Sequence, residues 1–184
     1  MSVFTSKGHH TYFVYGSNMN PELIFSRCGS PQPLGVARLA DHRLGFFGHS
    51  PTWDGGEEAV VPQKGEEVWG TLYRLSFPEA DRLDEWQGVR ADGSGPYFLF
   101  PVFAVDLGGV SHAALLYRRD HCGAPSLPSD AQRDYIVVGA RAQGMPAAYV
   151  DHLQKLPVKK AAYPVPRTES RWRGLLSSVC RACG

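Results

Sequence analysis

The chain has 184 residues, of which 43% are hydrophobic and 11% aromatic, and this length and composition predict one domain with one core. Nineteen Lys and Arg residues balance 18 Asp and Glu residues, so the formal net charge is +1. This balance lacks the basic excess that nucleic-acid and anionic-membrane binding require, and no apolar run reaches the length of a membrane span. A small molecule is therefore the expected partner.

The cysteine pattern and the first residues indicate a reduced, cytoplasmic protein. Cys180 and Cys183 form a C-x-x-C pair that closes the chain, whereas a redox pair of this kind opens a helix after a strand. We interpret the pair as incidental, with weak metal binding or redox chemistry as the alternatives. Residues 1–10 lack the apolar stretch of a signal peptide.

In the first half of the chain, short apolar runs separated by Gly and Pro predict strands joined by turns. The first strand covers residues 11–15 and stops at Gly16. A short helix begins at Asn20-Pro21, because Asn is a good N-cap and Pro suits the first helical turn. A bent strand is expected over residues 36–47. A hairpin then follows, with strands over residues 59–62 and 67–75 and a turn at Lys64-Gly65.

In the second half, the hydrophobic period changes from strand to helix and back. Residues 78–86 predict a helix that stops at Gly88, and further strands are expected over residues 97–105 and 112–117. Ser129 caps a helix to about Ala142, and Pro146 starts the last helix. The strands cluster and do not alternate regularly with helices, which favours an α+β barrel over a doubly wound sheet. We expect a single domain over 1–184, with tails at 1–10 and 164–184.

The loop after the first strand, Tyr15-Gly16-Ser17-Asn18-Met19, is the most informative short segment. A Gly followed by polar residues and a helix start presents free backbone N–H groups, which suit a carboxylate or a developing oxyanion. The alternative is an ordinary turn, in which Gly supplies unusual dihedrals and Ser or Asn caps the helix. The local sequence leaves both interpretations open.

Five further segments follow this loop in a recognisable order. They are Ala37-Arg38-Leu39 with Leu44 and Phe46, T-W-D-G-G at 52–56, G-E-E-V-W-G at 65–70, L-D-E-W-Q-G-V at 83–89, and Gly139-Ala140 with Met145-Pro146 and Tyr149. Together with YGSNM they resemble the γ-glutamylcyclotransferase family over residues 12–155. The resemblance implies a small mixed β-barrel with flanking helices, no cofactor and no metal. It also implies a cavity floored by Tyr15 to Met19, which bind the substrate.

Members of this family release a γ-glutamyl group as 5-oxoproline, a reaction that belongs to glutathione-related metabolism. The substrate's α-amine attacks its own γ-carbonyl, and one glutamate carries the protons in both directions. The resemblance implies that the position of this glutamate is occupied here by Gln87. An amide cannot accept the proton at neutral pH, and loss of a general acid–base costs about 10²- to 10⁴-fold in rate. Tyr97 matches a family tyrosine that donates a hydrogen bond, with a core aromatic as the alternative.

Neighbouring groups offer no evident replacement for the missing carboxylate. We interpret Asp84 and Glu85 as solvated charges, with Glu85 facing away from the site. His49, His112 and His121 lack metal-ligand spacing, and His49 is expected on a surface loop. Two more family tyrosines are replaced, by Gln132 and by Leu115, unless the second alignment shifts by two residues to Tyr117.

Gln87 is either an introduced substitution or a natural divergence, and the other departures from the family pattern favour natural divergence. Three hypotheses about the function follow. The first is a γ-glutamylcyclotransferase-like enzyme with Gln87 and Tyr97 at the reacting centre. The second is a non-catalytic small-molecule binder. The third is a cyclase or isomerase of another metabolite, with Tyr97 or a histidine moving the proton. The oligomeric state stays open.

Overall fold

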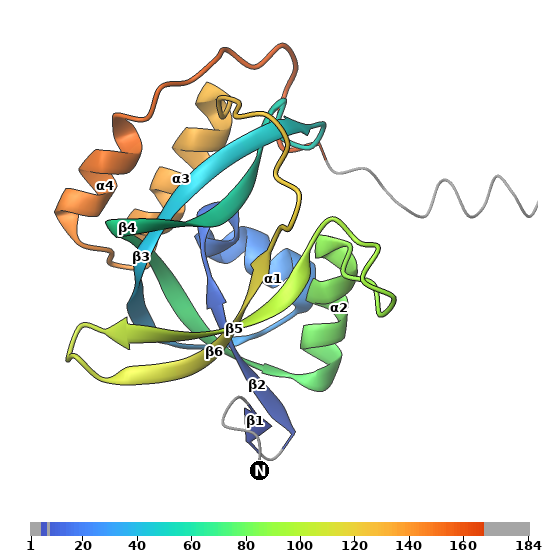
Figure 1. Ribbon diagram of the computed structural model, residues 1–184, viewed down its shortest axis with the longest axis vertical. Coiled ribbons are helices and arrows are strands. Elements are labelled where there is room, and N and C mark those ends of the chain that lie inside the picture. Colours follow the sequence, from blue (N-terminus) through green and yellow to red (C-terminus); the bar gives the residue numbers. More distant parts are fainter. Residues whose placement is uncertain (1–4, 7, 168–184) are drawn as a thin grey trace, which may run out of the picture.

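The computed structural model describes residues 5–6 and 8–167. Its strands follow the order β1-β2-β4-β3-β5-β6, and a parallel pairing of Tyr12 with Leu115 joins β2 to β6 (Figure 1). The remaining pairings are antiparallel, so the expected mixed β-barrel is confirmed. The strand bounds are β1 Thr5–Ser6, β2 His9–Val14, β3 Gln32–Ser50, β4 Gly55–Ser76, β5 Phe98–Asp106 and β6 Ser111–Arg118.

The helices flank the barrel in two pairs. α1 contacts α2, and α3 contacts α4 on another side of the barrel (Figure 1). Their ends follow the sequence signals: the Asn20 side chain accepts from Glu22 N, and Gly88 ends α2 in the left-handed region. The bounds are η1 Gly16–Met19, α1 Pro21–Cys28, α2 Phe77–Gln87, α3 Asp130–Ala142 and α4 Ala147–Gln154.

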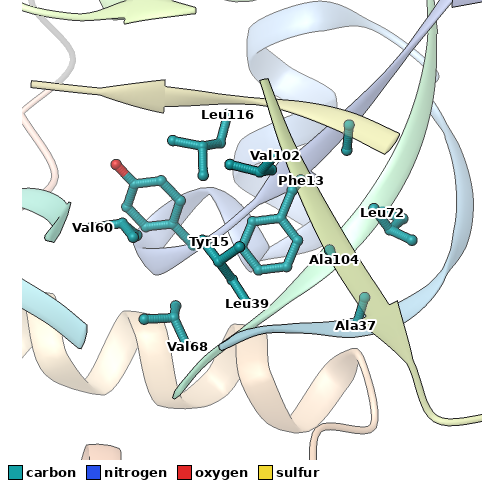
Figure 2. Packing of buried hydrophobic residues seen from close by; sticks show 11 residues of the cluster. Phe13, Tyr15, Ala37, Leu39, Val60, Val68, Leu72, Val102, Ala104 and Leu116 are labelled. Carbon is teal, nitrogen blue, oxygen red and sulfur yellow. The ribbon is translucent and has the colours of Figure 1, made fainter. Parts of the chain in front are cut away.

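Strand β2 is buried on both faces, because the barrel lies on one side and the helices α1 and α2 on the other. Phe13 points into the barrel together with side chains from β3, β4, β5 and β6 (Figure 2). Tyr12 and Val14 point outward and pack with Ile24 and Leu83. Alternation along a strand thus places successive residues in two different hydrophobic clusters. The continuation of β2 carries the chain directly into the loop at Tyr15.

The expected hairpin at Lys64-Gly65 is wrong. Strand β4 runs through this point and pairs with β3 on either side, with Ala40 opposite Glu67 and His42 opposite Pro62. Residues 63–66 form a wide bulge across from Asp41, whose carboxylate accepts a hydrogen bond of 2.8 Å from Gly65 N. A bulge and a turn both favour Gly at a left-handed position such as that of Gly65, so the local sequence did not distinguish them.

Both segments that were expected to be tails include residues that contact the barrel. Thr5–Ser6 pairs with β2, and β2 already includes His9 and His10. At the other end, Arg167 N donates a 2.7 Å hydrogen bond to the Thr52 carbonyl. Cys180 and Cys183 lie outside the described residues. Within the described part of the chain, no helix is both long and apolar enough to cross a membrane.

Candidate active site

A cavity of about 730 Å³ opens beside the loop that follows β2. Its wall brings together segments that are far apart in the sequence: the loop itself, α1, the start of β4, the end of α2, the residue before β5 and the end of β6. Polar and charged side chains converge here from all of these segments. They include Ser17, Asn18, Arg27, Glu57, Glu58, Gln87, Tyr97, Tyr117 and Arg119.

The loop predicted to bind substrate contributes some of its residues to the cavity wall. Tyr15, Ser17 and Asn18 line it, and the Tyr15 hydroxyl donates to the Tyr117 carbonyl at 2.6 Å. Gly16 makes the turn behind them with φ 61°. Met19 is fully buried and packs with the α3 and α4 side chains. The loop is therefore clamped between the cavity and the helices.

Arg27 on α1 was missed by sequence reasoning and lies in the cavity wall. Its Nη1 donates a hydrogen bond to Asn18 Oδ1, and its guanidinium lies 5.4 Å from the centre of the Trp86 ring. Among the described residues its buried Nε has no hydrogen-bond partner. Burial lowers the pKa of Arg27, but an arginine remains charged at neutral pH. The cavity wall therefore contains a partly buried cation whose buried Nε is an unused donor.

Glu58 on β4 was also missed, and it lies against the predicted loop. Its buried carboxylate accepts hydrogen bonds from Ser17 N to Oε2 at 2.8 Å and from Gln132 Nε2 to Oε1 at 3.2 Å. Burial raises the pKa of Glu58, although these donors and the charge of Arg27 act in the opposite direction. The Ser17 N–H that was expected to be free is thus already paired. The alternation of side chains along the strand could have predicted this inward position, because Glu58 lies two residues before Val60 and shares its face.

Glu57, Tyr97 and Arg119 form a second polar group in the same wall. Arg119 Nη1 lies 3.6 Å from Glu57 Oε2, and its guanidinium carbon lies 4.9 Å from the Tyr97 ring centre. The Tyr97 hydroxyl donates to the Glu58 carbonyl oxygen at 2.7 Å. Burial raises the pKa of Tyr97 well above its ordinary value, so the phenol keeps its proton. Tyr97 therefore fixes the β4 backbone from which Glu58 projects.

The end of α2 places Gln87 in the cavity wall, where Gly88 stops the helix. Two expectations about its neighbours are wrong. Asp84 is not solvated: its Oδ1 accepts from the Tyr117 hydroxyl at 2.6 Å and from the Tyr12 hydroxyl at 3.4 Å, and burial raises its pKa. Glu85 does not face away, because it lines the cavity although it is exposed.

The remaining candidates lie elsewhere. His49 is exposed at the end of β3, as expected, 4.0 Å from Asp54, and His112 pairs with Asp106 at 2.7 Å. His121 is exposed. Leu115 packs against the outer cluster of β2, and Tyr117, two residues on, is the β6 tyrosine in the cavity wall. The described residues contain no cluster of three or more His, Cys, Asp or Glu that could hold a metal ion.

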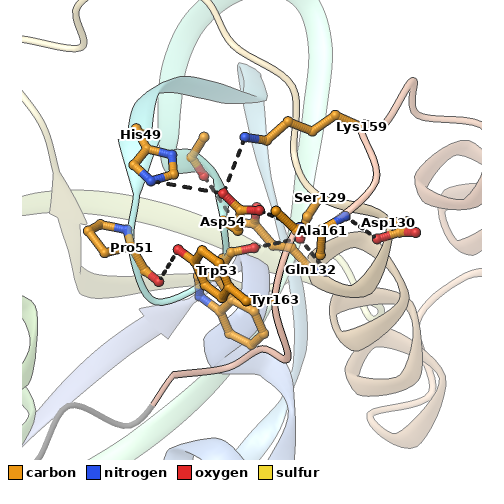
Figure 3. A network of polar contacts seen from close by, with 12 residues as sticks. His49, Pro51, Trp53, Asp54, Ser129, Asp130, Gln132, Lys159, Ala161 and Tyr163 are labelled. Atoms are coloured by element: carbon orange, nitrogen blue, oxygen red, sulfur yellow. Dashed lines mark hydrogen bonds and ion pairs between the residues drawn. The ribbon is translucent and has the colours of Figure 1, made fainter.

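A polar network anchors the loop between β3 and β4 at this wall (Figure 3). The Asp54 carboxylate accepts from Ala162 N at 2.6 Å and lies 3.6 Å from Lys159 Nζ. The Ser129 hydroxyl donates to the Trp53 carbonyl at 2.6 Å and also caps α3. Gln132, one turn into α3, reaches Gly56 O at 3.0 Å and Glu58. The start of α3 therefore holds both the loop and the buried carboxylate.

Comparison with known proteins identifies the class of protein to which this barrel and its cavity belong. The AIG2-like family model matches residues 67–153. γ-Glutamylcyclotransferases of Homo sapiens and Mus musculus are 33% and 32% identical over 150 residues, covering 79% of this chain and 77% of theirs. A solved structure described as a γ-glutamyl cyclotransferase aligns with a TM-score of 0.79 at 28% identity, covering 92% of this chain and 99% of that one.

The chain therefore belongs to the γ-glutamylcyclotransferase family of enzymes. A second solved structure, of the uncharacterized protein loc79017 from Homo sapiens, has a TM-score of 0.80 at 26% identity and covers 93% of this chain and 99% of that one.

Proposed function

We propose that this chain is a γ-glutamylcyclotransferase that acts on a small γ-glutamyl amide and releases 5-oxoproline. The observation that carries the proposal is the convergence of the Tyr15–Asn18 loop, Arg27 and Gln87 on one cavity in a member of this family. Arg27 offers a partly buried cation for the substrate's α-carboxylate, a pairing in which charge-assisted hydrogen bonds are strong.

In this proposal Gln87 orients the reacting amine and does not carry its proton. The side-chain oxygen can accept a hydrogen bond from the α-ammonium, but an amide is not protonated at neutral pH. Tyr97 acts as a positioning residue, because its hydroxyl is bonded to the Glu58 backbone. Holding the α-amine near the γ-carbonyl supplies much of the rate enhancement of an intramolecular attack.

The proposal includes the cytosol as the site of action and γ-glutamyl compounds of glutathione-related metabolism as substrates. The free thiols of Cys28 and Cys122 are consistent with a reducing compartment. One observation favours a second candidate, a non-catalytic binder: the amide at position 87 leaves the cavity without a proton carrier at that point. A diverged cyclase of another metabolite would use the same cavity with a different substrate.

The test measures 5-oxoproline release from a panel of γ-glutamyl dipeptides by the unmodified chain and by Gln87→Glu. Release by either form supports the proposal. A large gain in Gln87→Glu assigns the proton transfer to position 87, whereas equal and appreciable rates exclude that assignment. If neither form turns over any dipeptide but calorimetry detects binding of the same dipeptides, the protein is a binder and the proposal is wrong.

A further inference from the structure

We propose that Glu58 is the general base and acid of this site, doing from β4 the work that the family resemblance assigns to position 87. This inference rests on the proposed function. It concerns which residue of the cavity carries the proton, and it leaves the substrate class unchanged.

The position of Glu58 supports this role. Glu58 lines the cavity and is hydrogen-bonded through Oε2 to the backbone of the loop predicted to bind the substrate. The approach is close: a Cβ added to Gly16 would lie 1.9 Å from Glu58 Oε2. A carboxylate in this position lies beside whatever the loop binds. No movement of the strand is needed to bring it there.

The Glu58 carboxylate also has the chemical capacity to accept a proton. It accepts hydrogen bonds from the backbone and the side chain of Ser17 and from Gln132, whereas a carboxylate has about four lone-pair sites. An acceptor site therefore remains for an ammonium proton. Within the described residues, no basic side chain forms an ion pair with Glu58, so its charge is not neutralised by direct contact.

The other acids near the cavity are less suited to this role than Glu58. Glu57 is already paired with Arg119. Asp84 is bonded to two tyrosine hydroxyls, and Glu85 is exposed to solvent. Glu58 is thus the described cavity carboxylate that combines burial, a free acceptor site and contact with the loop. Burial also moves its pKa upward, in the direction that makes a carboxylate a better base near neutral pH.

The proton and bond changes balance with Glu58 as the carrier. Glu58 takes one proton from the α-ammonium, and the freed lone pair forms the bond to the γ-carbonyl carbon. The amide C–N bond then breaks. The ring nitrogen keeps one of its three hydrogens, and Glu58 passes the other two in turn to the leaving nitrogen, which departs as an ammonium ion. The carboxylate is regenerated.

Several groups facing Glu58 set the pH at which it works. The partly buried cation Arg27 favours the ionised form of Glu58, whereas the burial of Glu58 favours the neutral acid. The tyrosines near it have pKa values raised by burial and stay neutral in the working range. These neighbours are Arg27 on α1, Tyr15 after β2, Glu57 on β4, Tyr97 before β5, Arg119 after β6 and Tyr149 on α4.

The experiment compares Glu58→Gln with Glu66→Gln, a matched change at an exposed residue of the β4 bulge, using the γ-glutamyl dipeptide that the unmodified chain turns over best. We expect Glu58→Gln to lower kcat about 10²-fold or more with little change in KM, and Glu66→Gln to retain activity. In Glu58→Gln, the fall of kcat/KM at acidic pH should be absent, because the titrating carboxyl has been removed.

A second variant keeps the carboxylate and tests the role if Glu58→Gln fails to fold. Gln132→Met removes the donor to Glu58 Oε1, so the acidic limb should move to higher pH. An unmoved limb, or an active Glu58→Gln enzyme, overturns the inference and leaves the proposed function standing. Release by Gln87→Glu but not by the unmodified chain also overturns it. Release by neither form overturns the proposed function itself, and the inference with it.

Discussion

The backbone N–H of Ser17 donates a 2.8 Å hydrogen bond to Oε2 of Glu58, joining the loop after β2 to the interior of β4. The loop resembles an anion-binding turn, and its anion at this position is the protein's own carboxylate. A substrate carboxylate therefore has to be held elsewhere, and Arg27 supplies a partly buried cation in the same cavity wall. The contact ties the binding loop to the acid proposed to carry the proton.

Gly16→Ala should destabilise the protein because it forces a Cβ against Glu58. Gly16 has φ 61°, and the added carbon would lie 1.9 Å from Glu58 Oε2. Gly65 has φ 83° and nothing within 4 Å, so Gly65→Ala reports the backbone strain alone, about 1–2 kcal/mol. Urea unfolding should show a larger loss for Gly16→Ala than for Gly65→Ala. Equal losses would show that the Glu58 carboxylate moves away at no cost.

The stability of the protein should depend on pH through Glu58. Burial raises the folded-state pKa above the ordinary 4.5, so the stability that the neutral acid provides is complete below 4.5 and is lost as pH rises through the folded pKa. The free energy of unfolding of the unmodified chain, minus that of Glu58→Gln, should therefore fall as pH rises above 4.5 and then level off. A difference that is constant or rises with pH would contradict the raised pKa.

Asp84→Ala should cost about 1–3 kcal/mol of stability, because it leaves the buried Tyr117 and Tyr12 hydroxyls without their acceptor. Asp81 lies on the exposed face of the same helix, and Asp81→Ala should change stability by less than about 0.5 kcal/mol. Chemical denaturation of the two variants measures this difference. A cost for Asp84→Ala no larger than that for Asp81→Ala would restore the interpretation of Asp84 as a solvated charge.

The sequence predicted those parts of the fold that local chemistry determines. Asn20 and Ser129 were identified as helix caps because a capping side chain acts within a few residues of its own position. The Gly65 bulge was mistaken for a hairpin turn because the two share their local sequence chemistry. Pairing with β3 distinguishes them, and the pairs that flank the bulge join residues 20 or more positions apart.

The candidate site was predicted only in part for the same reason. Tyr15 to Asn18 and Gln87 were found through motifs, and these segments do meet at one cavity. Arg27, Glu57 and Glu58 carry no motif, and their importance comes from the barrel that brings them to the loop. Asp84 was taken as solvated because its two tyrosine partners, Tyr12 and Tyr117, lie on other elements.

The titration of Glu58 tests the central claim most directly, because the account requires a buried acid on β4 that is hydrogen-bonded to the binding loop and has no ion-pair partner among the described residues. Carbon-13 NMR of the glutamate side-chain carboxyls can follow Glu58, with Glu58→Gln identifying its signal. The account predicts that the Glu58 midpoint lies clearly above 4.5 and that it moves when a γ-glutamyl dipeptide is added to a slow variant such as Tyr97→Phe. A Glu58 midpoint at or below 4.5, unaffected by the dipeptide, would contradict it.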